Sequence, residues 1–223
     1  MKILLTLTIS ILMNFLPSSI KEEYKNFTLK PISNGVWAAI HKNPGGHAIC
    51  NAGIIDQGDK TIIIDPFMNP DAAEELKQGA RSLTGKDPGI VINTHHHNDH
   101  IRGNQVFPSA EIISTQWTKE QIPKNEPEEI AWEKKNAWAI LASYTSRLSS
   151  ANEMEKKELM LWIDYFDGIV KNIENVKTTV PNKTFTDSLW IKGSINTISI
   201  SEFKNAHTES DAAVFIPEKG IVF

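Results

Sequence analysis

The sequence has a single cysteine, Cys50, so no internal disulfide can stabilise its fold. Cys50 lies in the apolar segment AICNAGII, where a buried structural thiol is the expected role. The chain also lacks internal repeats and low-complexity linkers. Its 223 residues, 40% hydrophobic and 22% charged, predict a globular protein with one sizeable core.

An excess of positive charge is also lacking. The chain has 23 Lys and Arg residues against 27 Asp and Glu residues, which gives a net charge of −4. Nothing in this balance favours nucleic acid as a partner, and no acidic tail indicates disorder. Nucleic acid is therefore not an expected partner.

No apolar run is long enough to span a bilayer comfortably. The segment from Ile3 to Leu16 is apolar over about 14 residues, follows Lys2, and is ended by Pro17. These features are typical of a signal peptide, which we place at residues 1–20. No cysteine follows that could carry a lipid, so we expect a secreted or periplasmic protein without a stable membrane anchor.

Short isoleucine-rich segments in the first half predict buried strands. They are VWAAI from Val36, AICNAGIID from Ala48, TIIID from Thr61, GIVIN from Gly89 and AEIIST from Ala110. The sequence Gln57-Gly58-Asp59-Lys60 is placed like a hairpin loop between two of them. After Pro66, the segment NPDAAEELKQGARSL predicts a helix that Asn69 or Asp71 can cap.

The middle of the chain changes character. Apolar residues recur at spacings of three and four, which predicts two amphipathic helices over about residues 126–148 and 151–174. Ser150 and Glu153 have the spacing of a capping box at the start of the second helix. Strands return after Pro181 as SLWIKG, TISIS and AAVFIP, so the chain predicts a mixed α/β fold.

The segment THHHNDHIRG, which begins at Thr94, carries the strongest chemical signal. It contains His95, His96, His97, Asp99 and His100 directly after a predicted strand. Neutral imidazole and carboxylate are common zinc ligands. Alternate residues of an extended chain face the same side, so His95 and His97 can face one metal while His96 turns away. Asp99 and His100 can face a second metal where the chain turns.

A catalytic zinc ion usually has three protein ligands, so another histidine is needed. The remaining candidates are His41, His47 and His207. His207 lies in the polar loop NAHTESD between two predicted strands, where catalytic groups often lie. The other two flank KNPGG, where a surface position at the border of a substrate site is the simpler expectation.

These motifs resemble those of the metallo-β-lactamase superfamily. THHHNDHIRG agrees with the THxHxDHxxG pattern of these hydrolases at every fixed position. HTESD is similar to their later HTxxD segment, although Ala206 stands where glycine is common. The hairpin NAGIIDQGDKTIIIDP places Asp65 like their buried aspartate. The resemblance covers residues 27–223, and His100 gives the chain the pattern of glyoxalase II and the two-histidine lactamases.

The resemblance implies an αββα sandwich with metals at one edge and the helical pair, about residues 126–174, as an insertion. It implies two zinc ions. His95, His97 and His207 would hold the first ion, and Asp99 and His100 the second. Asp99 would also be catalytic, because it can orient the nucleophile and shuttle its proton.

The implied activity is hydrolysis of a small-molecule substrate, in which a zinc-bound hydroxide attacks a carbonyl such as that of a β-lactam amide or an ester. The alternatives are a glyoxalase II-like thioester hydrolase and a non-catalytic zinc-binding fragment. The family pattern continues with a bridging aspartate and a final histidine that would follow Phe223. We therefore expect the metallo-β-lactamase-like domain at residues 27–223 to be a fragment, incomplete at its C-terminus.

Overall fold

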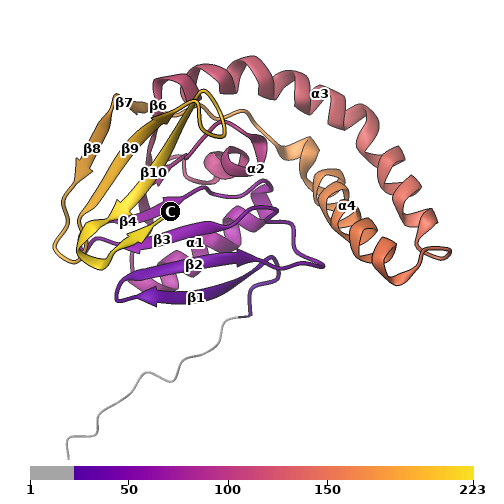
Figure 1. Cartoon of the computed structure of the whole chain (residues 1–223), viewed down its shortest axis with the longest axis horizontal. Helices are drawn as coiled ribbons and strands as arrows, with labels where there is room; N and C mark the ends of the chain where they lie inside the picture. Colours follow the sequence, from indigo (N-terminus) through magenta and orange to yellow (C-terminus); the bar gives the residue numbers. More distant parts are fainter. Residues whose placement is uncertain (1–22) are drawn as a thin grey trace, which may run out of the picture.

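The computed structural model describes residues 23–223, so the expected signal peptide lies outside the described part. Two β-sheets form the body of the molecule, and a long helical pair projects from it (Figure 1). The first sheet has the strand order β1 Phe27–Ser33, β2 Val36–His41, β3 Ala52–Asp56, β4 Thr61–Ile64, β5 Pro88–Ile92, β6 Glu111–Thr115 and β7 Lys183–Phe185. The second has the order β11 Ile221–Val222, β10 Ser210–Ile216, β9 Ile198–Lys204 and β8 Ser188–Ile191.

The predicted strands and the hairpin at residues 57–60 are confirmed, except that β3 begins only at Ala52. Strands β1 to β4 are antiparallel, whereas β4 to β7 run parallel. Parallel strands end at the same edge of a sheet. The residues that follow β4, β5 and β6 therefore meet at one edge, where a site can be built from several loops.

The two sheets pack face to face through an apolar layer. Ile55, Ile62 and Ile90 of the first sheet and Ile200 and Val214 of the second are fully or almost fully buried between them. Strand β10 alternates strictly between buried and half-buried residues, as expected for a strand with one face on the core. Burial of these branched side chains holds the sheets together and fixes their edges relative to one another.

Helix α1 (Pro70–Thr84) covers the other face of the first sheet, as its pattern predicts. Asn69 occupies the cap position and Pro70 the first turn, although the Asn69 side chain donates instead to the His47 carbonyl. Ala72 and Leu76 are fully buried against the sheet. The short helix α2 (Asn98–Ile101) and three 3-10 turns, at Arg102–Val106, Ile173–Asn175 and Pro217–Lys219, complete the fold.

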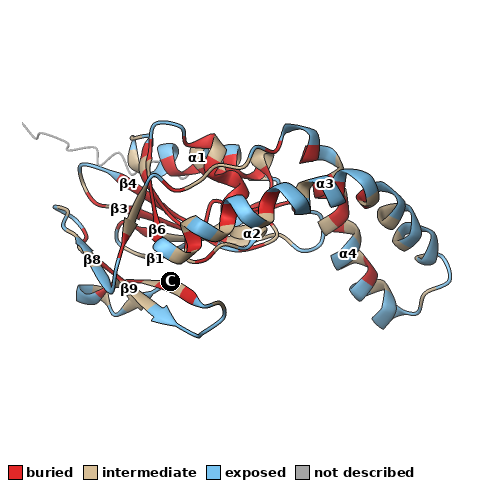
Figure 2. Cartoon of the chain, turned by 90° about the horizontal axis from the view of Figure 1, so that it is seen from above, coloured by how far each residue is buried: buried red, intermediate tan, exposed pale blue. Residues whose placement is uncertain are grey.

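The helical pair is present, but its boundaries differ from the prediction. Helix α3 spans Gln116–Arg147 and begins ten residues earlier than expected, because Thr115 caps it and the helix continues through Pro123 and Pro127. Helix α4 spans Glu153–Asn172. Its capping box uses Asn152 and Glu155 in place of the predicted Ser150 and Glu153. The far end of the pair is largely exposed (Figure 2).

The mixed α/β class with two stacked sheets is thus confirmed. Among residues 23–223, no helix combines the length and apolar character needed to cross a membrane.

Candidate metal centre

The histidine-rich segment lies where β5 ends at the shared edge of the first sheet. The chain bends at residues 94–96 and then forms α2, for which His97 occupies the cap position. The loop between β9 and β10 brings His207 to the same edge from the second sheet. The site therefore depends on the packing of the two sheets, since each supplies part of it.

His95, His97 and His207 converge as the sequence predicts. One ring nitrogen from each lies within 4.8 Å of the others. His207 Nε2 is 3.2 Å from His97 Nδ1, and the two rings are nearly perpendicular. His95 is buried, whereas the other two are exposed. Three imidazoles that meet at an open edge match the ligand set of a catalytic zinc with room for substrate.

Asp99 and His100 form a second group beside the first. His100 Nε2 lies 3.2 Å from Asp99 Oδ2, and the His100 ring is 4.2 Å from that of His95 between centroids. The third member of this group is Cys50, which the sequence predicted only as a structural thiol. Cys50 is buried, as expected, but its Sγ lies against Asp99 and donates to the backbone oxygen of that residue at 2.8 Å.

The buried side chain of Asp65 helps to orient both groups of candidate ligands. Its carboxylate accepts hydrogen bonds from the Thr94 backbone at 2.8 Å, from the Thr94 hydroxyl at 2.6 Å and from His100 Nδ1 at 2.8 Å. His95 Nδ1 lies 2.9 Å from the Thr94 hydroxyl. These contacts engage the Nδ1 atoms of His95 and His100, which leaves their Nε2 atoms for a metal.

Burial and neighbouring charges shift the pKa values of the four candidate ligands in different directions. Burial, followed by the nearby charge of His100, lowers the pKa of His95 to about 4, so its imidazole is neutral at pH 7. Burial raises the pKa of Asp99, but the hydrogen bond and charge of His100 outweigh it and leave the carboxyl ionised. Burial also raises the pKa of Cys50 to about 11. For His100, burial lowers the pKa, but the charge of Asp65 more than reverses that effect.

The donor set fits zinc. Nitrogen ligands bound tetrahedrally at about 2.0–2.1 Å lie about 3.3–3.4 Å from one another. The 3.2 Å between the His97 and His207 nitrogens is close to that separation. His96 belongs to neither cluster of candidate ligands within residues 23–223. The alternation expected of an extended chain is not seen, because the chain bends at residues 94–96 and the His96 ring lies 4.8 Å from that of His97 between centroids.

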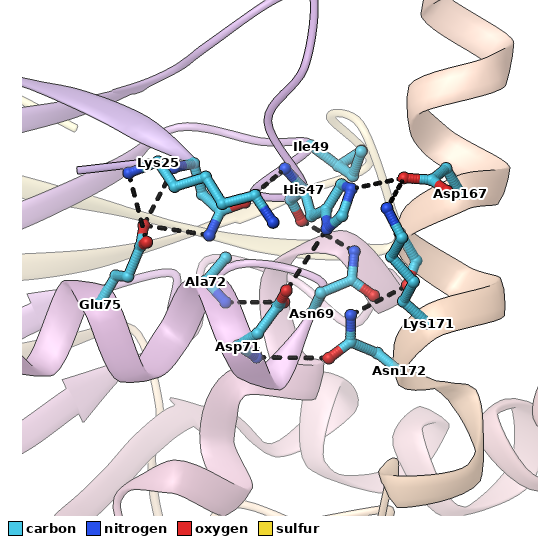
Figure 3. Close-up of polar contacts among 12 residues, drawn as sticks. Lys25, His47, Ile49, Asn69, Asp71, Ala72, Glu75, Asp167, Lys171 and Asn172 are labelled. Atoms are coloured by element: carbon cyan, nitrogen blue, oxygen red, sulfur yellow. Dashed lines mark hydrogen bonds and ion pairs between the residues drawn. The ribbon is translucent and has the colours of Figure 1, made fainter.

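His41 and His47 do not join the site. His47 was expected near the surface, yet it is 3% exposed and lies between the carboxylates of Asp71 and Asp167 (Figure 3). This arrangement could not be predicted from local sequence patterns, because Asp167 lies 120 residues from His47 along the chain.

A hollow of about 370 Å³ opens beside the first histidine group. Its wall includes His96, His97 and His207, the Trp117 ring at the start of α3, and the loop residues that flank His207. The volume lies within the range of small-molecule sites. The sequence analysis did not identify Trp117, because its position in this wall depends on the start of α3 at Gln116, ten residues before the predicted start.

Known proteins share both sequence and fold with this chain. The family model of the metallo-beta-lactamase superfamily matches residues 45–156. A hydroxyacylglutathione hydrolase of Prochlorococcus marinus is 28% identical over 109 residues, which are 45% of this chain and 35% of that protein. A metal-dependent hydrolase of Lysinibacillus sphaericus is 39% identical over 56 residues, which are 25% of this chain and 21% of that protein. The matched regions thus span about a third or less of these relatives.

Two solved structures resemble the chain in fold. The metallo-beta-lactamase FIM-1 from Pseudomonas aeruginosa, in its mono-zinc form, has a TM-score of 0.58 at 16% identity and covers 91% of this chain and 70% of its own. A metallo-beta-lactamase from Pontibacter korlensis has a TM-score of 0.57 at 14% identity, and the match covers 88% of this chain and 70% of that protein. The predicted fold is therefore confirmed, and such a fold suggests divalent-metal binding at the clustered histidines. With a family model that matches half of its residues, the chain belongs to the metallo-β-lactamase superfamily.

Proposed function

We propose that this protein is a zinc-dependent hydrolase that acts on a carbonyl substrate such as a β-lactam amide or an ester. The observation that carries the proposal is the convergence of His95, His97 and His207 from two sheets at an open edge, with Asp99 and His100 beside them. A buried network fixed by Asp65 supports these ligands. Hydrogen bonds that fix the orientation of imidazole rings are typical of functional metal sites.

The proposal assigns roles in metal binding and catalysis to the residues of the site. His95, His97 and His207 would hold the first zinc, and Asp99 and His100 would contribute to the second. Zinc held by these residues would lower the pKa of a water ligand to about 7 and would polarise the carbonyl of the substrate. The Asp99 carboxylate orients the attacking water and accepts its proton. The hollow beside Trp117 receives the substrate, which positions its carbonyl next to the histidines.

A second candidate is hydrolysis of a thioester of the hydroxyacylglutathione type. The observation that favours it is the name shared by several curated relatives, including the Prochlorococcus protein. Both candidates use the same metal ligands, so the ligands alone do not discriminate between them.

A direct comparison of substrates tests both candidates. The zinc-loaded full chain would be assayed with a chromogenic cephalosporin, an aryl ester and S-lactoylglutathione, beside a His97→Ala variant of equal helical content. Turnover of the cephalosporin or the ester that is lost in the variant supports the first candidate, and turnover of the thioester alone supports the second. Tight zinc binding without any turnover would instead indicate a non-catalytic zinc-binding protein.

We further propose export, with removal of residues 1–20, because Lys2 and the short apolar run before Pro17 are typical of a signal peptide. Mass spectrometry of protein from the native host tests this. A mature N-terminus near residue 20 in the extracytoplasmic fraction is expected, whereas an intact Met1 on cytoplasmic protein would contradict the proposal.

A further inference from the structure

We propose that Cys50 is a ligand of the second metal, with its thiolate joining Asp99 and His100 to form a mixed sulfur, oxygen and nitrogen site. The inference rests on the proposed metal binding and adds to it a donor from a part of the chain that the histidine motif does not contain. The Cys50 sulfur, one Asp99 carboxylate oxygen and one His100 nitrogen all lie within 4.8 Å of one another.

The loop that carries Cys50 is held in a costly conformation. Ile49, directly before it, has φ 69, in the left-handed region that β-branched residues rarely adopt. Several hydrogen bonds hold the segment. The Ile49 backbone donates to His41 Nδ1 at 3.2 Å, and the His41 backbone donates to Asn51 Oδ1 at 3.0 Å. The Met68 backbone donates to the Ala48 carbonyl at 3.2 Å. Strain of this kind persists where the surrounding structure fixes the residue, often beside a functional group. Here the group beside the strained residue is the thiol.

The neighbours of the thiol are oriented as metal ligands. His100 Nδ1 is bound to Asp65, so Nε2 is the nitrogen that faces Asp99, at 3.2 Å. Without Cys50, the second group would contribute two protein donors from the described residues. Zinc in proteins is usually four-coordinate and readily accepts thiolate, imidazole and carboxylate together. Metal binding would release the thiol proton to solvent and replace the weak hydrogen bond to the Asp99 backbone.

The competing explanation is that Cys50 only fills space at the edge of the core. It lies within the apolar cluster around Phe67 and Ala52, and it has 9% of its surface exposed. A packing role requires only a small side chain and predicts no contact between sulfur and metal. The two explanations therefore differ in a spectroscopic signal.

Cobalt(II) provides that signal, because a thiolate bound to cobalt gives an intense near-ultraviolet charge-transfer band that nitrogen and oxygen ligands do not give. Since Cys50 is the only cysteine in the sequence, any such band in the cobalt-loaded full chain comes from it. We expect the band in the wild type and in His207→Ala, which alters the first group. We expect Cys50→Ser to lose the band. Its affinity for the second metal should fall by at least about 10–100-fold, which is the loss typical when a residue that only hydrogen-bonds a metal ligand is removed.

X-ray absorption of the zinc-loaded wild type tests the proposal without any variant. A sulfur shell at about 2.3 Å from zinc is expected. Two bound metal ions with neither the charge-transfer band nor the sulfur shell would overturn the role of Cys50 while leaving the proposed function intact. A chain that binds no cobalt and no zinc would overturn both.

Discussion

The Nε2 atom of His47 lies 2.9 Å from a carboxylate oxygen of Asp167, and this contact joins the core of the protein to helix α4. The Nδ1 atom of the same ring lies 3.3 Å from Asp71 at the start of α1 (Figure 3). Lys171 also contacts Asp167, and Asn172 accepts a hydrogen bond from the Asp71 backbone at 3.4 Å. The helical pair is thus fastened to the sandwich by a buried imidazole between two carboxylates.

This arrangement predicts a pH dependence of stability. The hydrogen bond to Asp71 raises the pKa of His47 more than burial lowers it, and Asp167 raises it further. A raised folded-state pKa gives stability that is complete below the unfolded value of about 6.5 and is lost as pH rises through the folded value. The free energy of unfolding of the wild type should therefore exceed that of His47→Gln most at about pH 5–6, and by less above about pH 7.

Urea unfolding of both proteins across this pH range, with a chelator present, measures the difference. At low pH, protonation of the Asp71 and Asp167 carboxyl groups removes the stabilising effect of these contacts. Burial raises the pKa of Asp71 and Asp167, but hydrogen bonds, including those from His47, outweigh it and lower both values. Their contribution is then lost only as the pH falls below about 4. A stability difference that does not change from about pH 5 to 9 would contradict this account.

Gly103 allows the metal-binding segment to pack against the chain that follows β4. A Cβ atom at this position would lie 1.8 Å from the backbone oxygen of Pro66. We expect Gly103→Ala to lower the free energy of unfolding by at least about 1–3 kcal/mol, because backbone on both sides must move. The matched control is Gly89→Ala, whose Cβ would meet nothing closer than the Lys60 side chain at 3.8 Å.

Thermal unfolding distinguishes the two glycine variants. A loss of 1 kcal/mol corresponds to about 2–4 °C in a protein of this size. Equal melting temperatures for Gly103→Ala and the wild type would show that the close approach to Pro66 is not required.

We expect substitution of His97 to remove metal binding and substitution of its neighbour His96 to leave it unchanged. His97 is exposed and its Nδ1 faces His207, so His97→Ala should abolish hydrolysis and the first metal site while the fold remains largely intact. His96 belongs to neither ligand group, so His96→Ala should keep its metal content. Elemental analysis, activity and circular dichroism of both variants test this. Comparable metal loss in the two proteins, or full activity in metal-free His97→Ala, would refute it.

Arg102 ties the metal-binding segment to α3. Its buried guanidinium lies 3.1 Å from Glu126 and 2.7 Å from Glu133. Arg102→Met would leave two buried carboxylates without a counter-charge, at an expected cost of about 3–5 kcal/mol in the free energy of unfolding. Adding Glu126→Gln and Glu133→Gln should recover part of that loss.

Denaturant unfolding at pH 7 provides the comparison. The exposed pair Lys134–Glu174 is the control, and Lys134→Met should cost less than about 1 kcal/mol. Similar losses for Arg102→Met and Lys134→Met would show that burial adds nothing to the Arg102 cluster.

The fold class and most of the candidate metal ligands could be predicted from the amino-acid sequence, because both are encoded in short segments. Isoleucine-rich segments such as the one from Thr61 predict buried strands wherever they occur, and β4 forms there. The motif that begins at Thr94 contains four of the candidate ligands within six residues, so their types and order are visible in the sequence. The separation of His95 and His97 from His96 arises at a bend of the chain and not in an extended strand. His207 could be selected because a polar loop between two strands exposes its side chain.

Contacts between residues far apart in the sequence depend on the tertiary structure. Helix α3 begins at Gln116 and continues through Pro123 and Pro127, and its first turns bury Thr118 and Ile122. Tertiary packing can override the local preference of such residues. The position of Cys50 against Asp99, 49 residues away, depends on how the strained loop before β3 folds across the sheet edge. Local patterns report periodicity and propensity, whereas contacts between loops depend on how whole sheets and helices pack, which no short segment encodes.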